Sequence, residues 1–88
     1  FKTFDEVIER ANDNDLGLCS YLYTNSMDKA HIGSEKLESG CVAVNTGVVA
    51  IAEAPFGGIK QTGYGREGGS GAIKDYLNVK YTHMGLKI

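Results

Sequence analysis

Hydrophobic and polar positions recur with a helical period near the start of the chain. The apolar members of this run lie at the spacing of one helix face: Phe4, Val7, Ile8 and Ala11. Thr3 comes just before them, and a glutamate follows it three residues later, which is the spacing of a capping box. We therefore expect a helix over residues 4–14, ended by Gly17.

Two short apolar runs predict strands, over residues 18–23 and residues 41–44. Between them, either Asn25 or Ser26 can cap a second helix, which we expect to end at Gly40. Strands that alternate with helices favour an α/β architecture in which neighbouring strands are parallel.

The second half of the chain is less regular. Residues 46–54 are apolar, but Pro55 disfavours a helix just before it, so we expect a loop. A third helix is predicted from the stripe Ala72, Ile73, Tyr76 and Leu77, and a terminal strand over residues 79–84. So few strands around a long loop make an incomplete sheet. Because the first residue is Phe1, we expect the chain to begin inside a longer polypeptide.

Composition limits the classes of function. The 88 residues make at most one domain, and 42% hydrophobic with 23% charged residues is ordinary for a globular chain. The formal net charge is -2, and no basic cluster indicates nucleic-acid binding. No apolar run approaches the roughly 20 residues that a membrane span needs.

The two cysteines, Cys19 and Cys41, favour an intracellular protein with two buried, reduced thiols, although a disulfide between them stays an alternative. Both lie in apolar strand contexts, which raise the pKa of a thiol, so we do not expect either to be a nucleophile. No histidine or cysteine lies at metal-ligand spacing, and we expect no metal site.

Glycine is concentrated in one segment, since seven of the twelve glycines fall between Gly57 and Gly71. Such density predicts a backbone with left-handed dihedral angles or close contacts. The run from Gly63 to Gly68 matches G-x-G-x-x-G, but it follows a poor strand and no acidic residue lies at the required distance. We interpret it as a structural turn that leads into the third helix, and not as a phosphate loop.

Three side chains in this segment are candidates for a role. Arg66 and Glu67 are interpreted as a structural clamp, with Glu67 placed favourably at the start of the third helix. Phe56 is either the wall of a pocket or an anchor that holds the loop to the core.

Residues 55–67, which read PFGGIKQTGYGRE, resemble the C-terminal signature of the NAD(P)-dependent aldehyde dehydrogenases. Residues 5–12 (DEVIERAN) followed by residues 16–18 (LGL), and residues 37–45 (LESGCVAVN), are similar to further segments of that family in the same order. The closing residues 76–86 most resemble its succinate-semialdehyde dehydrogenase branch. The resemblance covers nearly the whole chain.

The resemblance implies an α/β fold in which residues 1–78 are the C-terminal part of the catalytic domain and residues 79–88 are an oligomerisation strand. It implies an enzyme that oxidises an aldehyde, succinate semialdehyde or a related semialdehyde, with NAD or NADP. The nucleophilic cysteine, the glutamate that acts as general base and the dinucleotide domain would all lie upstream. We therefore expect this segment alone to bind no cofactor and to be inactive.

By the same resemblance, residues 47–54 and Phe56 line the aldehyde channel, and the candidate substrate-binding residues are Ala50, Ile51 and Phe56. The succinate-semialdehyde branch usually has a serine five residues before the Pro-Phe motif, where this chain has Ala50. The implied partners are the rest of the dehydrogenase chain and further copies of it in a dimer or tetramer, in the cytoplasm. Two other hypotheses stay open: a stand-alone module that binds an anion in its glycine loop, and an interaction segment that acts through its terminal strand.

Overall fold

Two parallel strands form the centre of the fold. The computed structural model describes residues 1–87, and in it β2 (Cys19–Leu22) pairs in parallel with β3 (Cys41–Val44). The register places Cys19 opposite Cys41 and Leu22 opposite Val44. The predicted parallel pairing and the strand over residues 41–44 are confirmed, and the first strand is shorter than predicted.

The first helix, α1 (Phe4–Asn12), begins at the predicted cap. The Thr3 hydroxyl accepts a hydrogen bond from the backbone N–H of Glu6 at 3.1 Å. The carboxylate of Glu6 reaches back to the N–H of Lys2 instead of Thr3, at 2.8 Å. The helix ends two residues before the predicted end because Asp13 leaves the helical conformation.

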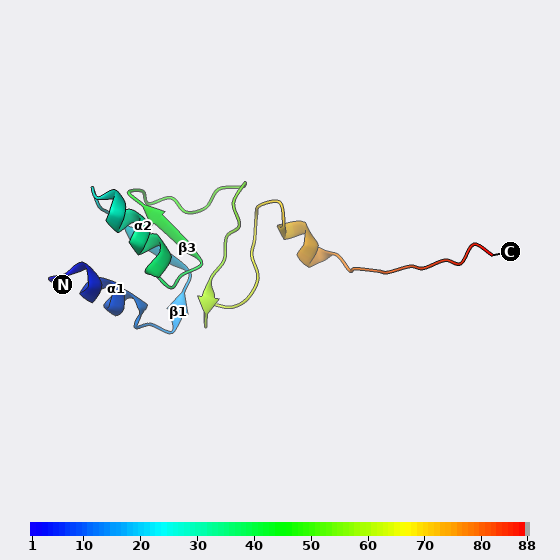
Figure 1. The fold of residues 1–88 in the computed structure, drawn as a ribbon, viewed down its shortest axis with the longest axis horizontal. Coiled ribbons are helices and arrows are strands. Elements are labelled where there is room, and N and C mark those ends of the chain that lie inside the picture. Colours follow the sequence, from blue (N-terminus) through cyan, green and yellow to red (C-terminus); the bar gives the residue numbers. More distant parts are fainter. Residues whose placement is uncertain (88) are drawn as a thin grey trace.

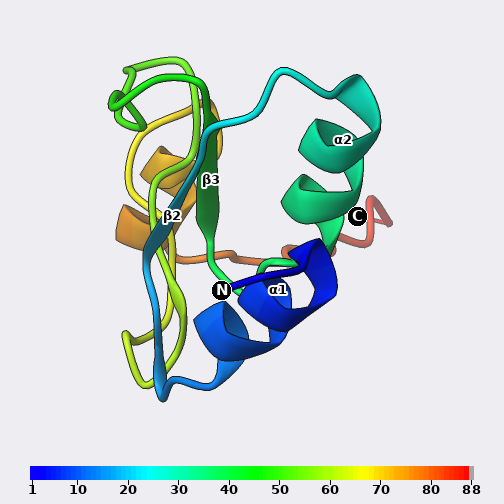
Figure 2. The ribbon, with the colours of Figure 1, turned by 90° about the vertical axis from the view of Figure 1, so that its left-hand side faces the viewer.

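The second helix, α2 (Met27–Lys36), connects β2 to β3. Ser26, one of the two candidates, caps it by accepting a hydrogen bond from the N–H of Lys29. The helix ends before the predicted Gly40 because Leu37 is extended. Figure 2 shows α1 and α2 on one side of the β2–β3 pair, while the later glycine-rich chain lies on the other side.

A second, antiparallel strand pair joins distant parts of the chain. β1 (Leu16–Gly17) pairs with β4 (Ile59–Lys60), with Leu16 opposite Lys60. Residues 59–62, interpreted from the sequence as a poor strand, form only this two-residue β4. Two residues are too few to show a period of two, so this pairing has no sequence signal.

The chain from residue 72 onward extends away from the body. The predicted third helix is a single 3₁₀ helix, η1 (Ala72–Tyr76), and the residues beyond it form no strand pair within residues 1–87. Figure 1 shows this tail leading away from the fold, and the chain with its tail extends over 76 × 24 × 19 Å. The expected strand over residues 79–84 is therefore not formed within this chain. Residue 88 of the predicted oligomerisation segment lies outside the described residues.

The core is small for a chain of this length. Among the hydrophobic side chains of residues 1–87, only Ile8 and Ala43 are buried. Val79 and Tyr81 in the tail are almost fully exposed, and so are Tyr64 and Tyr76. A complete domain of this size would bury about 60% of the surface of its unfolded chain. None of the helices in the described part of the chain is long and apolar enough to cross a membrane.

Candidate functional site

The glycine segment, residues 55–71, forms a closed loop on the strand side of the fold. Phe56 and Glu67 pair across its base, each donating its backbone N–H to the carbonyl of the other at 2.7 Å. The N–H of Gly69 donates to the carbonyl of Ala52 at 2.9 Å, which fixes the preceding apolar loop to the same base. The glycine segment and the apolar loop of residues 46–54 are thus held together.

Four glycines of this segment are required by its backbone. Gly63, Gly65, Gly68 and Gly69 have φ angles of 120°, 85°, 67° and 69°, a region that other residues adopt only with strain. No helix begins at Gly68, since η1 starts only at Ala72. A dinucleotide fingerprint needs a helix N-terminus at that point to face the phosphates. The predicted left-handed dihedral angles are therefore confirmed, and no helix N-terminus lies behind this run to face a phosphate.

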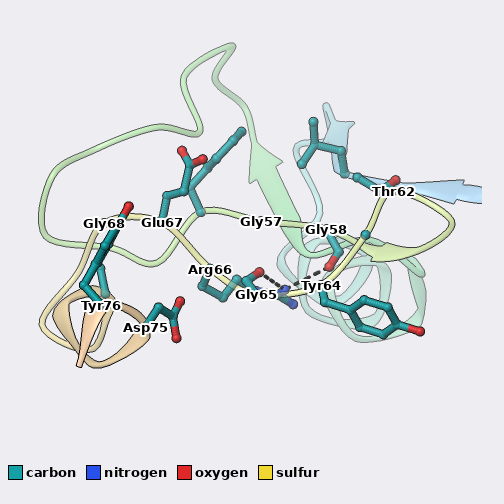
Figure 3. Close-up of a pocket in the computed structure, with 14 residues that line it drawn as sticks. Gly57, Gly58, Thr62, Tyr64, Gly65, Arg66, Glu67, Gly68, Asp75 and Tyr76 are labelled. Carbon is teal, nitrogen blue, oxygen red and sulfur yellow. Dashed lines mark hydrogen bonds between the residues drawn. The ribbon is translucent and has the colours of Figure 1, made fainter. Parts of the chain in front are cut away.

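Arg66 acts as an internal clamp. Its Nη1 donates hydrogen bonds to the carbonyls of Gly58 and Gly65, both at 2.8 Å, as Figure 3 shows. The side chain of Glu67 points away from Arg66 in the same view. The prediction that Glu67 lies at the start of the third helix was wrong, because η1 begins only at Ala72 and is preceded by Gly71.

The loop encloses an open hollow of about 570 Å³. Half-buried Phe56 lines it, together with Leu18, Tyr64, Tyr76 and several glycines. Arg66, Glu67 and Asp75 are its charged side chains, and the Arg66 guanidinium already donates to two carbonyls. The two carboxylates would repel an anion, so this charge arrangement does not favour the anion-binding module.

The three candidate substrate residues lie in two places. Phe56 is in the wall of the hollow, whereas Ala50 and Ile51 lie in the exposed loop before it and are not among the lining residues. Ile51 is 57% exposed. Within this chain, Ala50 and Ile51 are therefore exposed to solvent.

Two polar anchors that the sequence analysis did not identify fix the loop to the body. The Thr62 hydroxyl accepts a hydrogen bond from the N–H of Gly17 at 2.9 Å. The Lys60 ammonium donates to the carbonyls of Asn12 and Asn14 at 3.0 and 3.1 Å and pairs with Glu38 at 2.7 Å. The sequence signal for these two anchors was the fixed order of lysine and threonine between glycines. The groups that Lys60 and Thr62 bind are too distant in sequence to be inferred from it.

The two cysteines are free thiols, as expected, but they are half-buried and not buried. Burial raises the pKa of the Cys19 thiol, and the neighbouring Cys41 raises it further. A nucleophile needs the opposite shift, so Cys19 is unsuited to that role. Within residues 1–87, no three metal-binding side chains come together.

Comparison with known proteins gives consistent results. Residues 1–82 match the sequence profile described as the aldehyde dehydrogenase family. The chain is 47% identical over 85 residues to the succinate semialdehyde dehydrogenase of Acinetobacter baylyi, and 48% identical over the same length to the 3-sulfolactaldehyde dehydrogenase of Pseudomonas putida. Each alignment covers 97% of this chain.

The fold gives the same result. The structure of an aldehyde dehydrogenase from Bacillus cereus in complex with NAD+ superimposes with a TM-score of 0.90 at 41% identity, over 99% of this chain and 18% of that one. The chain likewise spans 18% of the length of the Acinetobacter and Pseudomonas relatives. With a profile match over residues 1–82 and this agreement in structure, the chain belongs to the aldehyde dehydrogenase family.

Proposed function

We propose that this chain is the C-terminal part of an enzyme that oxidises an aldehyde to a carboxylate with NAD or NADP. The observation that carries the proposal is the 47% identity to a succinate semialdehyde dehydrogenase over 97% of the chain. Residues 1–78 then belong to the catalytic domain, and residues 79–88 form a strand that pairs between subunits of a dimer or tetramer. We place the enzyme in the cytoplasm, a compartment in which thiols such as those of Cys19 and Cys41 stay reduced.

The substrate class follows from what two relatives have in common. Succinate semialdehyde and 3-sulfolactaldehyde are both short aldehydes with an acidic group at the far end, a carboxylate in one and a sulfonate in the other. We expect the same class for the enzyme that contains this chain. The glycine segment does not supply the charge that would hold the acidic group, because Arg66 is already bound to backbone carbonyls. Cationic side chains outside this chain would hold it.

The contribution of this chain is to form and fix one wall of the aldehyde channel. Phe56 gives the channel an apolar surface at the base of the glycine segment, where the paired hydrogen bonds with Glu67 hold its backbone. Residues 47–54, with Ala50 and Ile51, extend that wall toward the entrance. A rigid wall positions the aldehyde for attack, and misplacement of a substrate by about 1 Å can lower the rate by about 100-fold.

The nicotinamide cofactor does not fit the residues of this chain. The G-x-G-x-x-G run has the glycines of a dinucleotide loop but no helix N-terminus behind it. We therefore assign cofactor binding, the nucleophilic cysteine and the general base to parts of the enzyme outside these residues.

The test is made on the intact protein from its natural source. Its mass is measured first, and we expect a value several times the 9.4 kDa of this chain. Reduction of NAD and NADP is then followed with succinate semialdehyde, 3-sulfolactaldehyde and butanal, an uncharged aldehyde of similar length. We expect kcat/KM to be higher for the two acidic aldehydes. No reduction with any aldehyde would disprove the dehydrogenase, whereas a preference for butanal would disprove only the substrate class.

A further inference from the structure

The two cysteines lie directly opposite each other on neighbouring strands. Cys19 of β2 and Cys41 of β3 are register partners, and Figure 2 shows the two strands side by side. Opposite residues of a parallel pair project to the same face of the sheet. Neighbouring strands are about 4.8 Å apart, within the Cα separation of about 4.4–6.8 Å that a disulfide allows. The backbone therefore already holds both residues at bridging distance.

The two thiols are neighbours across the strand pair. Burial raises the pKa of the Cys19 thiol, and the neighbouring Cys41 raises it further. The Cys41 sulfur also lies 3.7 Å from the carbonyl oxygen of Gly57, a weak contact for a thiol donor. Within this chain both thiols are half-buried, so neither is fully enclosed by its own core.

We propose that Cys19 and Cys41 are a redox-sensitive dithiol that closes to a disulfide between β2 and β3 when it meets a peroxide. In the first step one thiolate attacks hydrogen peroxide, which yields a sulfenic acid and water. The second thiol then displaces the hydroxyl group, which leaves as a second water and forms the S–S bond. Two thiols lose two hydrogens in total, and one peroxide is reduced to two waters.

A thiol reacts through its thiolate, and the raised pKa of Cys19 disfavours that form. Attack on the peroxide by Cys19 is therefore disfavoured. Both sulfurs belong to one chain, so the second step needs no encounter between molecules.

The bond is expected to be reversible. The Cβ atoms of parallel partners stay near the strand spacing, somewhat beyond the relaxed Cβ separation of about 3.5–4.5 Å in a disulfide. Closing the bridge therefore pulls the strands together, and a strained disulfide is reduced more readily. Oxidation also removes the Cys41 thiol hydrogen that points to Gly57, the neighbour of Phe56. The bridge would thus act on the base of the glycine segment.

The test uses the full-length protein, reduced and then freed of reductant. It is treated with hydrogen peroxide, the remaining thiols are blocked with N-ethylmaleimide, and trypsin digestion is carried out without reduction. Cleavage after lysine and arginine leaves Cys19 in the peptide of residues 11–29 and Cys41 in the peptide of residues 37–60. We expect these two peptides to be recovered mainly as one linked species, lighter than their sum by two hydrogens, that separates on addition of dithiothreitol.

Three variants make the result specific to this pair. The linked species should be absent from Cys19→Ser and from Cys41→Ser. A double variant, Cys19→Ser with Ser20→Cys, keeps the thiol content but moves one thiol to the opposite face of β2, and it should not form the link. A free cysteine peptide in the same tube controls for the oxidation. If that peptide is oxidised while both alkylated peptides of the native protein are recovered separately, the proposal is overturned. A link from Cys41 to any cysteine other than Cys19, or a link of equal yield in the double variant, would also overturn it.

Discussion

At the scale of single residues, Ala50 is the position that we expect to bear on substrate choice. We expect a serine hydroxyl at this position to donate a hydrogen bond to a substrate carboxylate. A hydrogen bond to a charged group contributes about 1.5–3 kcal/mol. We therefore predict that Ala50→Ser in the full-length enzyme lowers the KM for succinate semialdehyde about tenfold, with little change for butanal. Initial rates with both aldehydes measure it.

Ala52→Ser is the matched control, because it adds the same hydroxyl two residues further along the same exposed loop. Its KM for succinate semialdehyde should stay unchanged. If Ala50→Ser has an unchanged or higher KM, position 50 does not contact the carboxylate. Equal effects from both variants would point to the loop in general.

Asn45, just after β3, carries a second residue-level prediction. Its φ is 58°, in the left-handed region, and its amide makes two 2.9 Å hydrogen bonds with the backbone of Thr24 after β2. Asn45→Ala loses both bonds and keeps a strained backbone, so we expect a loss of about 2–3 kcal/mol of stability. Asn45→Gly loses the same bonds without the strain and should lose less.

Thermal unfolding of the two full-length variants measures the difference. The sequence placed Asn45 only as the end of a strand, because neither its dihedral angle nor its partner on the other strand has a local signal. An equal fall in Tm for both variants would mean that the backbone conformation at this position contributes nothing.

At the scale of elements, Gly40 decides how closely the glycine segment packs on the sheet. A Cβ at Gly40 would lie 2.9 Å from the Cα of Gly58 and closer still to the carbonyl of Gly57. Backbone atoms cannot move aside as a flexible side chain can, so Gly40→Ala should force the segment outward. We predict a loss of about 1–3 kcal/mol or more, and a lower kcat because Phe56 moves with its neighbour.

Gly71→Ala is the control, since a Cβ there meets nothing within 4 Å and its φ is −89°. Tm and kcat of the control should match those of the native enzyme. Native behaviour of Gly40→Ala would show that the segment does not pack this closely in the complete protein.

These elements also show how far the sequence could predict the fold. The long periodic run of α1, the Thr3 cap and the β2–α2–β3 unit have strong local patterns, and each was predicted to within a few residues. The β1–β4 pair was missed because it is two residues long and joins distant segments. In the site, too, features with a local sequence pattern were predicted and features that depend on tertiary contacts were not. The clamp role of Arg66 was predicted, whereas the anchors through Lys60 and Thr62 depend on tertiary contacts.

At the scale of the whole molecule, the balance of buried and exposed surface is unusual. Only two hydrophobic side chains of the described residues are buried, while Leu77, Val79 and Tyr81 of the tail are exposed. Hydrophobic burial is the main favourable term in folding. We infer that the other parts of the enzyme and its neighbouring subunits cover this surface. The separate 88-residue chain should accordingly show no cooperative melt by circular dichroism, and a sharp transition would contradict that inference.

The tail carries the last prediction at this scale. An extended segment with free N–H and C=O groups can add to the edge of a sheet in another subunit. Proline removes one N–H, and successive N–H groups of a strand point to opposite edges. One of the variants Tyr81→Pro and Thr82→Pro must therefore remove a bond to the partner, and we expect it to shift the full-length enzyme toward monomer in sedimentation velocity. Thr82→Val keeps the shape and the N–H and should leave the oligomer intact. If both proline variants also sediment as the native enzyme does, the subunits are held together by some surface other than this strand.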